Sequence, residues 1–273
     1  MVEYLPLALV WAALALHLLG ERRAAVLTGR PRDRRARSRA LMFYGGLLTI
    51  FVALSSPVEN LAQRLLWAHM IEHLLLLLVA APLIVLSAPW MSLWRPLPLG
   101  FRRTVARTLV RSPWCAPLRA IGGAVMRPLG AWLLFTVNLV FWHLPALYDL
   151  TLRNTTVHAL EHITFLVFGV LFWLQVIPSP PFRPTLSHLQ RVVYLVAATI
   201  PNVGVAMYLA FSSSVLYAPY AQLAHRPGNI SALADQQIAA GIMWSFGDVP
   251  FAIAIALLIH RWLAGQEARA SVV

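Results

Sequence analysis

Apolar residues fall into long blocks along this chain, and short Arg-rich or polar segments separate the blocks. Each block has about 17 to 25 residues, the length that a helix needs to cross the hydrocarbon core of a bilayer. The blocks lack the residue-by-residue alternation of barrel strands, so only helices satisfy a backbone buried in lipid. The pattern predicts an all-α integral membrane bundle, a single domain over residues 1–273. Its seven transmembrane helices are expected at about 4–20, 40–57, 65–88, 128–146, 157–177, 190–212 and 239–263.

The distribution of arginines predicts how the bundle is oriented across the membrane. Arginines crowd the segments 22–39 and 95–127, whereas the opposite side of the predicted bundle keeps only Arg64, Arg153 and Arg226. The positive-inside rule therefore places the Arg-rich segments and the C-terminus in the cytoplasm and the N-terminus outside. Basic residues follow the first apolar block instead of preceding it, so we expect a retained helix and not a signal peptide.

Composition narrows the class of partner. The chain is 59% hydrophobic and 12% charged, with a formal net charge of +12. In a soluble protein this charge would suggest nucleic acid, but here the arginines lie between apolar blocks, so we expect a lipid bilayer as the partner and no nucleic acid. Within the segment 95–127, Phe101, Val105 and Leu109 recur at helical spacing among arginines, which predicts a short helix on an anionic membrane surface.

Two copies of one motif carry the candidate chemistry. The pattern H-x-x-E-H spans His69 to His73 and recurs from His158 to His162, each time in the first turns of a helix that enters from the outer side. Ionisable side chains are expensive inside a bilayer, so they usually mark a functional interior. Residues four apart share a helix face, so each His pair can offer two imidazoles to one ion, with Glu72 or Glu161 as a ligand or an orienting partner.

Other donors are expected at a similar depth, near the outer ends of the later helices. His225 in the last outer loop is a further candidate, whereas His17, His188 and His260 belong to the cytoplasmic half. Asp248 lies deeper, where a helix-packing or proton-relay role is expected. The candidate metal ligands are His69, Met70, Glu72, His73, His143, His158, Glu161, His162, Met207 and Met243.

Ligand chemistry favours copper. Imidazole suits copper, zinc and iron, and added thioether shifts the preference towards Cu(I). Zinc stays an alternative, as does a haem held between two imidazoles, although the chain has no C-x-x-C-H attachment motif. With Cys115 as the one cysteine, neither an internal disulfide nor a paired-cysteine metal site is available.

Two further functional classes stay open. H-x-x-E-H is also the zinc motif of one metalloprotease class. Such an enzyme needs one motif and a third ligand downstream, whereas this chain has two matched motifs and only apolar residues after His73 in its helix. A transporter would use the intramembrane Asp248 and Asn202, but few other polar residues continue a path between them. A metal-binding protein without catalytic turnover is the expected class.

Several stretches resemble the CtaG family of caa3-type cytochrome c oxidase assembly factors. They are W-A-H-M-I-E-H with the apolar run to Pro89, F-W-H-L-P at 141–145, the second H-x-x-E-H, L-Y-A-P-Y at 216–220 and A-D-Q-Q-I-A-A-G-I-M-W at 234–244. The similarity runs from about residue 40 to 263. Individually these motifs are modest, but their order on the predicted helices is fairly specific.

This resemblance implies a multi-pass protein of the bacterial plasma membrane that is needed to make active haem-copper oxidase. A metallochaperone that passes copper to an oxidase subunit is the function it favours, and an assembly scaffold without metal is the alternative. The resemblance leaves homo-oligomerisation open.

Overall fold

The computed structural model describes residues 5–29, 33–55 and 57–270. Within these ranges the chain is helical, with a single isolated β-bridge between Ser179 and Phe182, so the predicted all-α class is confirmed. Residues 4 and 56, Arg30 and Arg32, which the predicted helices and basic segments include, lie outside the described residues. The elements are α1 Leu5–Thr28, α2 Arg34–Ala53, α3 Val58–Ala62, α4 Leu66–Leu74, η2 Leu75–Ala80, α5 Ala81–Ser87, α6 Trp90–Trp94, α7 Leu99–Arg111, η3 Pro113–Cys115, α8 Ala116–Val125, α9 Pro128–Trp142, α10 Pro145–Arg153, α11 Thr155–Leu174, α12 His188–Phe211, α13 Ala218–Ala221, η4 Pro227–Asn229 and α14 Ala232–Ala270.

Four of the described helices are long and apolar enough to cross a membrane. They are Leu66–Ser87, Thr155–Leu174, His188–Phe211 and Ala232–Gln266. The pair Pro113–Val125 and Pro128–Trp142 is bent by 81° and gives a fifth crossing if it forms one broken span. α1 and α2 occupy the positions of the first two predicted spans but do not meet the same requirement; α2 begins with arginines at 34, 35, 37 and 39. Seven crossings and the orientation of the termini stay predictions.

The predicted helix 65–88 is one span built from three segments. α4 and α5 are α-helical, and the π-helix η2 lies between them. Pro82 explains the change, because its ring clashes with the carbonyl four residues before it and its nitrogen has no hydrogen to donate. The N–H of Ala81 bonds instead to the carbonyl of Leu76. The carbonyl of Leu77, which would need a donor at Pro82 in a π-helix, accepts a hydrogen bond from Nε1 of Trp173 at 3.0 Å.

Other boundaries differ from the prediction by up to eight residues, since α1 continues to Thr28 where the predicted helix ends at residue 20. The predicted helix 128–146 ends at Trp142, and a separate helix, α10, begins at Pro145, a residue type favoured in a first helical turn. The last helix starts at Ala232 instead of 239. The short helix predicted around Phe101, Val105 and Leu109 is present as α7, and none of its residues is buried.

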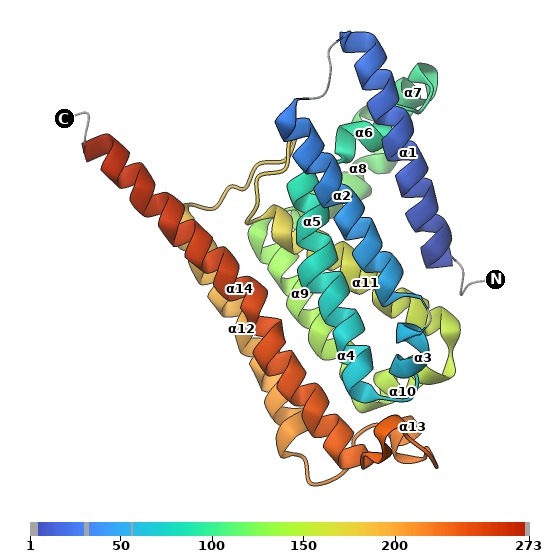
Figure 1. Ribbon diagram of the computed structural model, residues 1–273. Coiled ribbons are helices and arrows are strands. Elements are labelled where there is room, and N and C mark those ends of the chain that lie inside the picture. Colours follow the sequence, from blue (N-terminus) through green and yellow to red (C-terminus); the bar gives the residue numbers. More distant parts are fainter. Residues whose placement is uncertain (1–4, 30–32, 56, 271–273) are drawn as a thin grey trace.

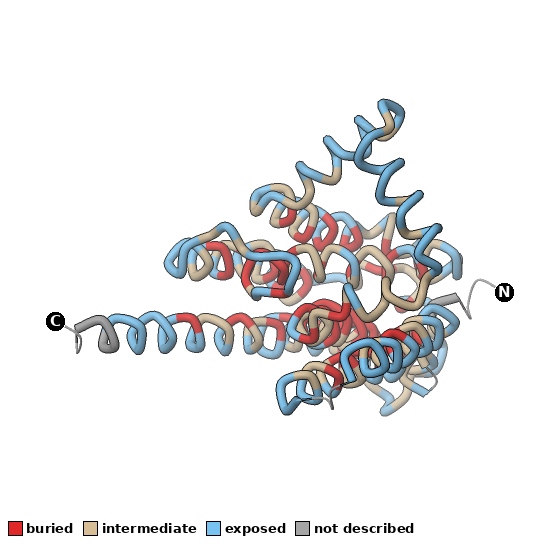
Figure 2. The backbone as a smooth tube through the Cα atoms, turned by 90° about the horizontal axis from the view of Figure 1, so that it is seen from above, coloured by how far each residue is buried: buried red, intermediate tan, exposed pale blue. Residues whose placement is uncertain are grey.

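The long helices run alternately in opposite directions through the bundle (Figure 1). α12 and α14 pack along each other, and α4, α5, α9 and α11 form the centre. The short helices α3, α10 and α13 gather at the end where α4 begins, whereas α6 and α7 lie at the opposite end. In Figure 2 the buried residues concentrate in the middle of the bundle, and the C-terminal part of α14 is exposed.

The central position of the α4–α5 span sets the environment of the first H-x-x-E-H motif. Of its most apolar stretch 56% is buried inside the protein, compared with 22% for the span in α14. α11 approaches it closely at Gly169, where an added Cβ would lie 3.1 Å from both Ala81 Cβ and Leu77 Cδ1. The protein interior, and not lipid, therefore surrounds the side chains of this span that face α11.

Candidate metal site

The two H-x-x-E-H motifs face each other across α4 and α11. The ring of His69 lies 5.1 Å from that of His158 and 5.9 Å from that of His162, measured between centroids. The rings of His73 and His162 lie 5.6 Å apart. Within α4, the i, i+4 spacing brings Nε2 of His69 to 2.9 Å from Nε2 of His73. The four imidazoles predicted from the repeat therefore converge on one region inside the bundle.

Each glutamate of the repeat lies against histidines of the other helix. Glu161 on α11 has one oxygen 3.5 Å from Nε2 of His69 and the other 3.5 Å from Nε2 of His73. Glu72 on α4 lies 3.8 Å from Nε2 of His162. The side chains of both glutamates and of His69 have no exposed surface. The two motifs thus complete each other, and we name their six residues, His69, Glu72, His73, His158, Glu161 and His162, the His–Glu cluster.

The His–Glu cluster contains two overlapping sets of four donor atoms. One set comes from His69, His73, Glu161 and His162, and the other from His69, Glu72, His158 and His162. In each set the atoms lie within 4.8 Å of one another. Ligands bound about 2.0 to 2.2 Å from one tetrahedral ion lie roughly 3.3 to 3.6 Å apart, so small side-chain adjustments would let either set hold an ion.

The buried carboxylates are the strongest indication of a cation. None of the four oxygens of Glu72 and Glu161 has a hydrogen-bond donor among the described residues, and the same holds for Nε2 of His162 and Nε2 of His158. A buried carboxylate without donors is costly unless it pairs with a positive charge or coordinates a metal. The donor set therefore fits a bound metal ion, which would provide these oxygens and imidazole nitrogens with a common partner.

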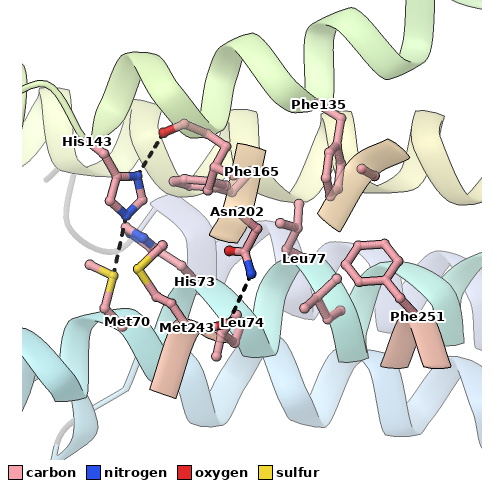
Figure 3. A pocket seen from close by; sticks show the side chains of 13 residues that line it. Met70, His73, Leu74, Leu77, Phe135, His143, Phe165, Asn202, Met243 and Phe251 are labelled. Carbon is pink, nitrogen blue, oxygen red and sulfur yellow. Dashed lines mark hydrogen bonds between the residues drawn. The ribbon is translucent and has the colours of Figure 1, made fainter. Parts of the chain in front are cut away.

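Three further predicted ligands lie beside the His–Glu cluster and belong to neither set. His143, Met70 and Met243 are buried and line a small cavity together with His73 (Figure 3). Nε2 of His143 lies 3.4 Å from Sδ of Met70.

The remaining candidates lie apart from these groups. Met207 is 40% exposed and does not line the cavity. Asp248 accepts a hydrogen bond from Nδ2 of Asn202 at 3.5 Å. His188, His225 and His260 are exposed. His17 is buried and stacks on Phe43 with ring centroids 4.3 Å apart.

Three buried tyrosines, which the ligand analysis of the sequence missed, cover the His–Glu cluster at the α10 and α13 end. Tyr148 lies 5.1 Å from the ring of His69 and stacks on Tyr217 at 4.0 Å, measured between ring centroids. Tyr217 donates a hydrogen bond to the carbonyl of His143 at 3.1 Å. Burial raises the pKa of Tyr217 and Tyr220, so both hydroxyls keep their protons as donors. The motif L-Y-A-P-Y contains Tyr217 and Tyr220 and was the available signal.

Tyr220 orients one of the imidazoles. Its hydroxyl donates to the carbonyl of Ala62 and lies 3.4 Å from Nδ1 of His69. Because the phenol has one proton, its oxygen acts as an acceptor towards His69, which places the ring proton on Nδ1 and leaves Nε2 free as a ligand.

Asp235 fixes the start of α4 from another helix. Its carboxylate accepts hydrogen bonds from the N–H groups of Leu66 at 2.8 Å and Trp67 at 3.1 Å, which have no partner within α4. The adjacent Gln236 accepts from the N–H of Leu216 and donates to the carbonyl of Leu209. The motif A-D-Q-Q therefore sets the position of the first H-x-x-E-H motif relative to α14.

One edge of the His–Glu cluster is more accessible than the rest. The side chain of His158 is 13% exposed, whereas that of His69 is fully buried. Nδ1 of His158 lies 3.5 Å from Oε1 of Glu59, which is 19% exposed. An ion that reaches the cluster from solvent would therefore meet Glu59 and His158 first.

The helical spans and the cluster together define an α-helical membrane protein with a buried site suited to a metal ion. A family model described as cytochrome c oxidase caa3 assembly factor (Caa3_CtaG) matches residues 16–265, and the chain belongs to this family. The resemblance read from the sequence motifs is thereby confirmed.

Relatives from mycobacteria align with most of the chain. Uncharacterized protein Mb0105 of Mycobacterium bovis and uncharacterized protein MT0111 of Mycobacterium tuberculosis are each 27% identical over 233 residues, which cover 85% of this chain. Uncharacterized protein ML1998 of Mycobacterium leprae is 25% identical over 240 residues, or 86% of this chain. The alignments cover 35% of each relative, so the chain spans about a third of their length. No solved structure matches the chain.

Proposed function

We propose that this protein is an assembly factor for cytochrome c oxidase that binds copper in the His–Glu cluster and delivers it to a copper centre of the oxidase. Family membership supports the assembly role. The observation that carries the metal-binding part is the pair of buried carboxylates that lack hydrogen-bond donors and lie among four imidazoles. The oxidase subunit that receives the ion and the bacterial plasma membrane around both proteins belong to the same proposal.

Electrostatics favours a bound cation, and ligand type favours copper. A positive ion would offset the charge of Glu72 and Glu161, which the surrounding apolar bundle does not. Imidazole nitrogens bind copper and zinc alike, so they do not choose between the two ions. The thioethers of Met70 and Met243 beside the cluster shift the preference towards Cu(I).

A carrier must both hold and release its ion, and the residues divide these roles. Tyr220 holds His69 so that Nε2 faces the other donors, while Glu161 lies against His69 and His73 at equal distances. Because His69 and His162 belong to both donor sets, an ion can exchange one set for the other without leaving the cluster. Copper bound there needs no bond-making chemistry, so we propose a non-catalytic role.

A membrane metalloprotease is the alternative with a specific structural argument, because Glu161 gives His69 and His73 the carboxylate partner that the sequence lacks after His73. A catalytic metal, however, keeps one position open for water or substrate. Here His162 completes the set of four donors, and Tyr148, Tyr217 and Tyr220 cover the cluster. The site is closed, as expected for storage or transfer of an ion.

The contacts of Asn202 and Asp248 give the transporter alternative less support than the metal carrier. Nδ2 of Asn202 donates to the carbonyl of Met243 at 3.0 Å, and Gly247 packs against the same side chain. Asn202 and Asp248 are thereby engaged in the contact between α12 and α14.

Metal analysis of the purified protein tests the proposal. After aerobic incubation with one equivalent of Cu(II), an ion that thioether sulfur does not favour, and gel filtration in detergent, the wild type should retain the ion, whereas the double variant His73→Ala/His162→Ala should lose it. The matched control is His188→Ala/His260→Ala, which removes two exposed imidazoles. Equal copper in all three proteins would remove the proposal. A Soret band in the isolated protein would identify haem instead, and Glu72-dependent cleavage of a membrane peptide would identify a protease.

A further inference from the structure

A small cavity adjoins the His–Glu cluster at His73, and part of its lining is polar. Its volume is about 20 Å³, enough for one water-sized particle. Most of the wall is apolar, with leucines and phenylalanines from α4, η2, α9, α11 and α14. The exceptions are His73, His143, Asn202 and the thioethers of Met70 and Met243. Figure 3 shows the two histidines and the two methionines together at one end, with Asn202 nearer the middle.

The hydrogen bonds of His143 determine which of its ring nitrogens points a lone pair towards this cavity. Nδ1 lies 2.7 Å from the carbonyl oxygen of Leu139, which can only accept, so Nδ1 carries the proton. The other nitrogen, Nε2, lies 3.4 Å from Sδ of Met70 (Figure 3). In the tautomer that this hydrogen bond selects, Nε2 carries a lone pair, and a thioether sulfur has no hydrogen to donate. Two acceptors thus face each other in a buried site without a donor between them.

We propose that His143 Nε2, Met70 Sδ and Met243 Sδ form a second copper site, selective for Cu(I), in the cavity next to the His–Glu cluster. A cation accepts electron pairs from both facing acceptors, which explains a contact that packing alone leaves unfavourable. With metal–nitrogen and metal–sulfur bonds of about 2.0 and 2.3 Å, the nitrogen–sulfur separation of 3.4 Å corresponds to an angle of about 104° at the ion. This angle is close to tetrahedral.

The residue types select the oxidation state. Thioether sulfur is soft and neutral, so it favours Cu(I) over Zn²⁺, Mg²⁺ or other ions that prefer oxygen. Among the described residues, none of those that line this cavity has a carboxylate. Zinc should therefore not bind to the thioether site, whereas the imidazoles of the His–Glu cluster accept either ion, so the second site adds the selectivity for Cu(I) that imidazole alone lacks.

His73 connects the two sites. Its Nε2 lies in the cluster, 2.9 Å from Nε2 of His69, and its ring also lines the cavity. Nδ1 of His73 is buried without a hydrogen-bond partner among the described residues. An ion that moves between cluster and cavity stays within reach of this imidazole and keeps its charge, so the transfer requires no electron donor. The inference rests on the proposed function for the identity of the ion and adds a second position along its path.

Cu(I) loading of the full chain in detergent, under anaerobic reducing conditions, tests the inference. Copper-edge X-ray absorption of the wild type should show sulfur scattering at about 2.3 Å, and the protein should bind two equivalents. Met70→Leu/Met243→Leu should lose one equivalent and the sulfur signal. Leucine keeps the apolar volume of the two positions, so the fold should be retained. Met91→Leu/Met207→Leu, which changes two exposed methionines, is the matched control.

A second pair of variants separates the two proposals. His69→Ala/His158→Ala removes cluster ligands that do not line the cavity, and it should lose one equivalent while it keeps the sulfur signal. Absence of sulfur scattering in the wild type, or an unchanged signal after Met70→Leu/Met243→Leu, overturns the second site. Full copper binding in the His69→Ala/His158→Ala variant overturns the cluster as the carrier site and leaves the thioether site standing. Sulfur scattering with zinc alone overturns the selectivity for Cu(I).

Discussion

Glu161 on α11 lies 3.5 Å from Nε2 of His73 on α4, although each residue belongs to its own H-x-x-E-H motif. Glu72 makes the reciprocal approach to His162 at 3.8 Å. Neither helix alone provides two imidazoles and a carboxylate in one donor set; each set needs residues from both helices. A complete donor set therefore requires both copies of the motif, because each copy contributes ligands that the other lacks.

This relationship predicts the effect of removing one carboxylate. Glu161→Gln keeps the shape of the side chain but loses its charge, so copper affinity should fall about 10- to 100-fold. Since each tenfold loss is about 1.4 kcal/mol, the stabilisation of the protein by a fixed excess of copper should fall by about 1.4 to 2.8 kcal/mol. Copper titration and thermal unfolding in detergent measure both quantities. Glu21→Gln, on α1 and outside the cluster, should behave like the wild type, and an equal loss there would contradict the assignment.

The accessible edge of the cluster predicts a kinetic effect. Glu59 lies beside the most exposed imidazole, His158, and its carboxylate attracts cations towards the site. Glu59→Gln should slow copper loading several-fold while the equilibrium affinity changes little. Stopped-flow quenching of tryptophan fluorescence measures the rate, and its salt dependence should be weaker in the variant. Identical rates and salt dependence in both proteins would place the access route elsewhere.

The close approach of α11 to the π-helical segment predicts a packing effect. A side chain at Gly169 would press on Ala81 and Leu77, so Gly169→Val should reduce the free energy of unfolding by about 1 to 3 kcal/mol. Gly241→Val is the matched control, because an added Cβ there meets nothing within 4 Å. Thermal unfolding of the metal-free proteins compares the two. If both variants lose the same stability, helix propensity and not the α11 contact is responsible.

The capping of α4 by Asp235 predicts a graded response. Asp235→Ala removes the acceptor for the N–H groups of Leu66 and Trp67 and should reduce stability by about 1 to 2 kcal/mol. Asp235→Asn keeps one acceptor oxygen and should lose less. Copper affinity should fall in the same order, since the first turn of α4 positions His69. Equal stability of the Ala and Asn variants would show that the contact with α4 does not depend on these hydrogen bonds.

The local sequence pattern was sufficient to predict the helices and to select the six residues of the His–Glu cluster. Apolar runs gave helices near their observed positions, and the i, i+4 spacing placed His69 and His73 on one face, as it did His158 and His162. Shifts at the boundaries follow from proline. Pro82 introduces the π-helical segment, and Pro145 begins a separate helix after His143. These effects are local, but a hydrophobicity pattern does not contain them.

Which residues outside the two motifs reach the site depends on how the helices are oriented about their axes in the bundle. Met207 and Met243 looked equivalent in the sequence, yet one is 40% exposed and the other buried in the cavity wall. Tyr220 and Asp235 reach the site from segments far away in the chain. No period in the sequence reports such contacts, because they are set by tertiary packing.

The sequence by itself determined the helical class, the family and the six residues of the His–Glu cluster, because helix formation and side-chain spacing are local properties of the chain. The tertiary structure decided that Glu72 and Glu161 each lie against histidines of the opposite helix, that three tyrosines cover the cluster and that His143 faces Met70. Those outcomes depend on the depth and rotation of neighbouring helices, which are set by the packing of the whole bundle.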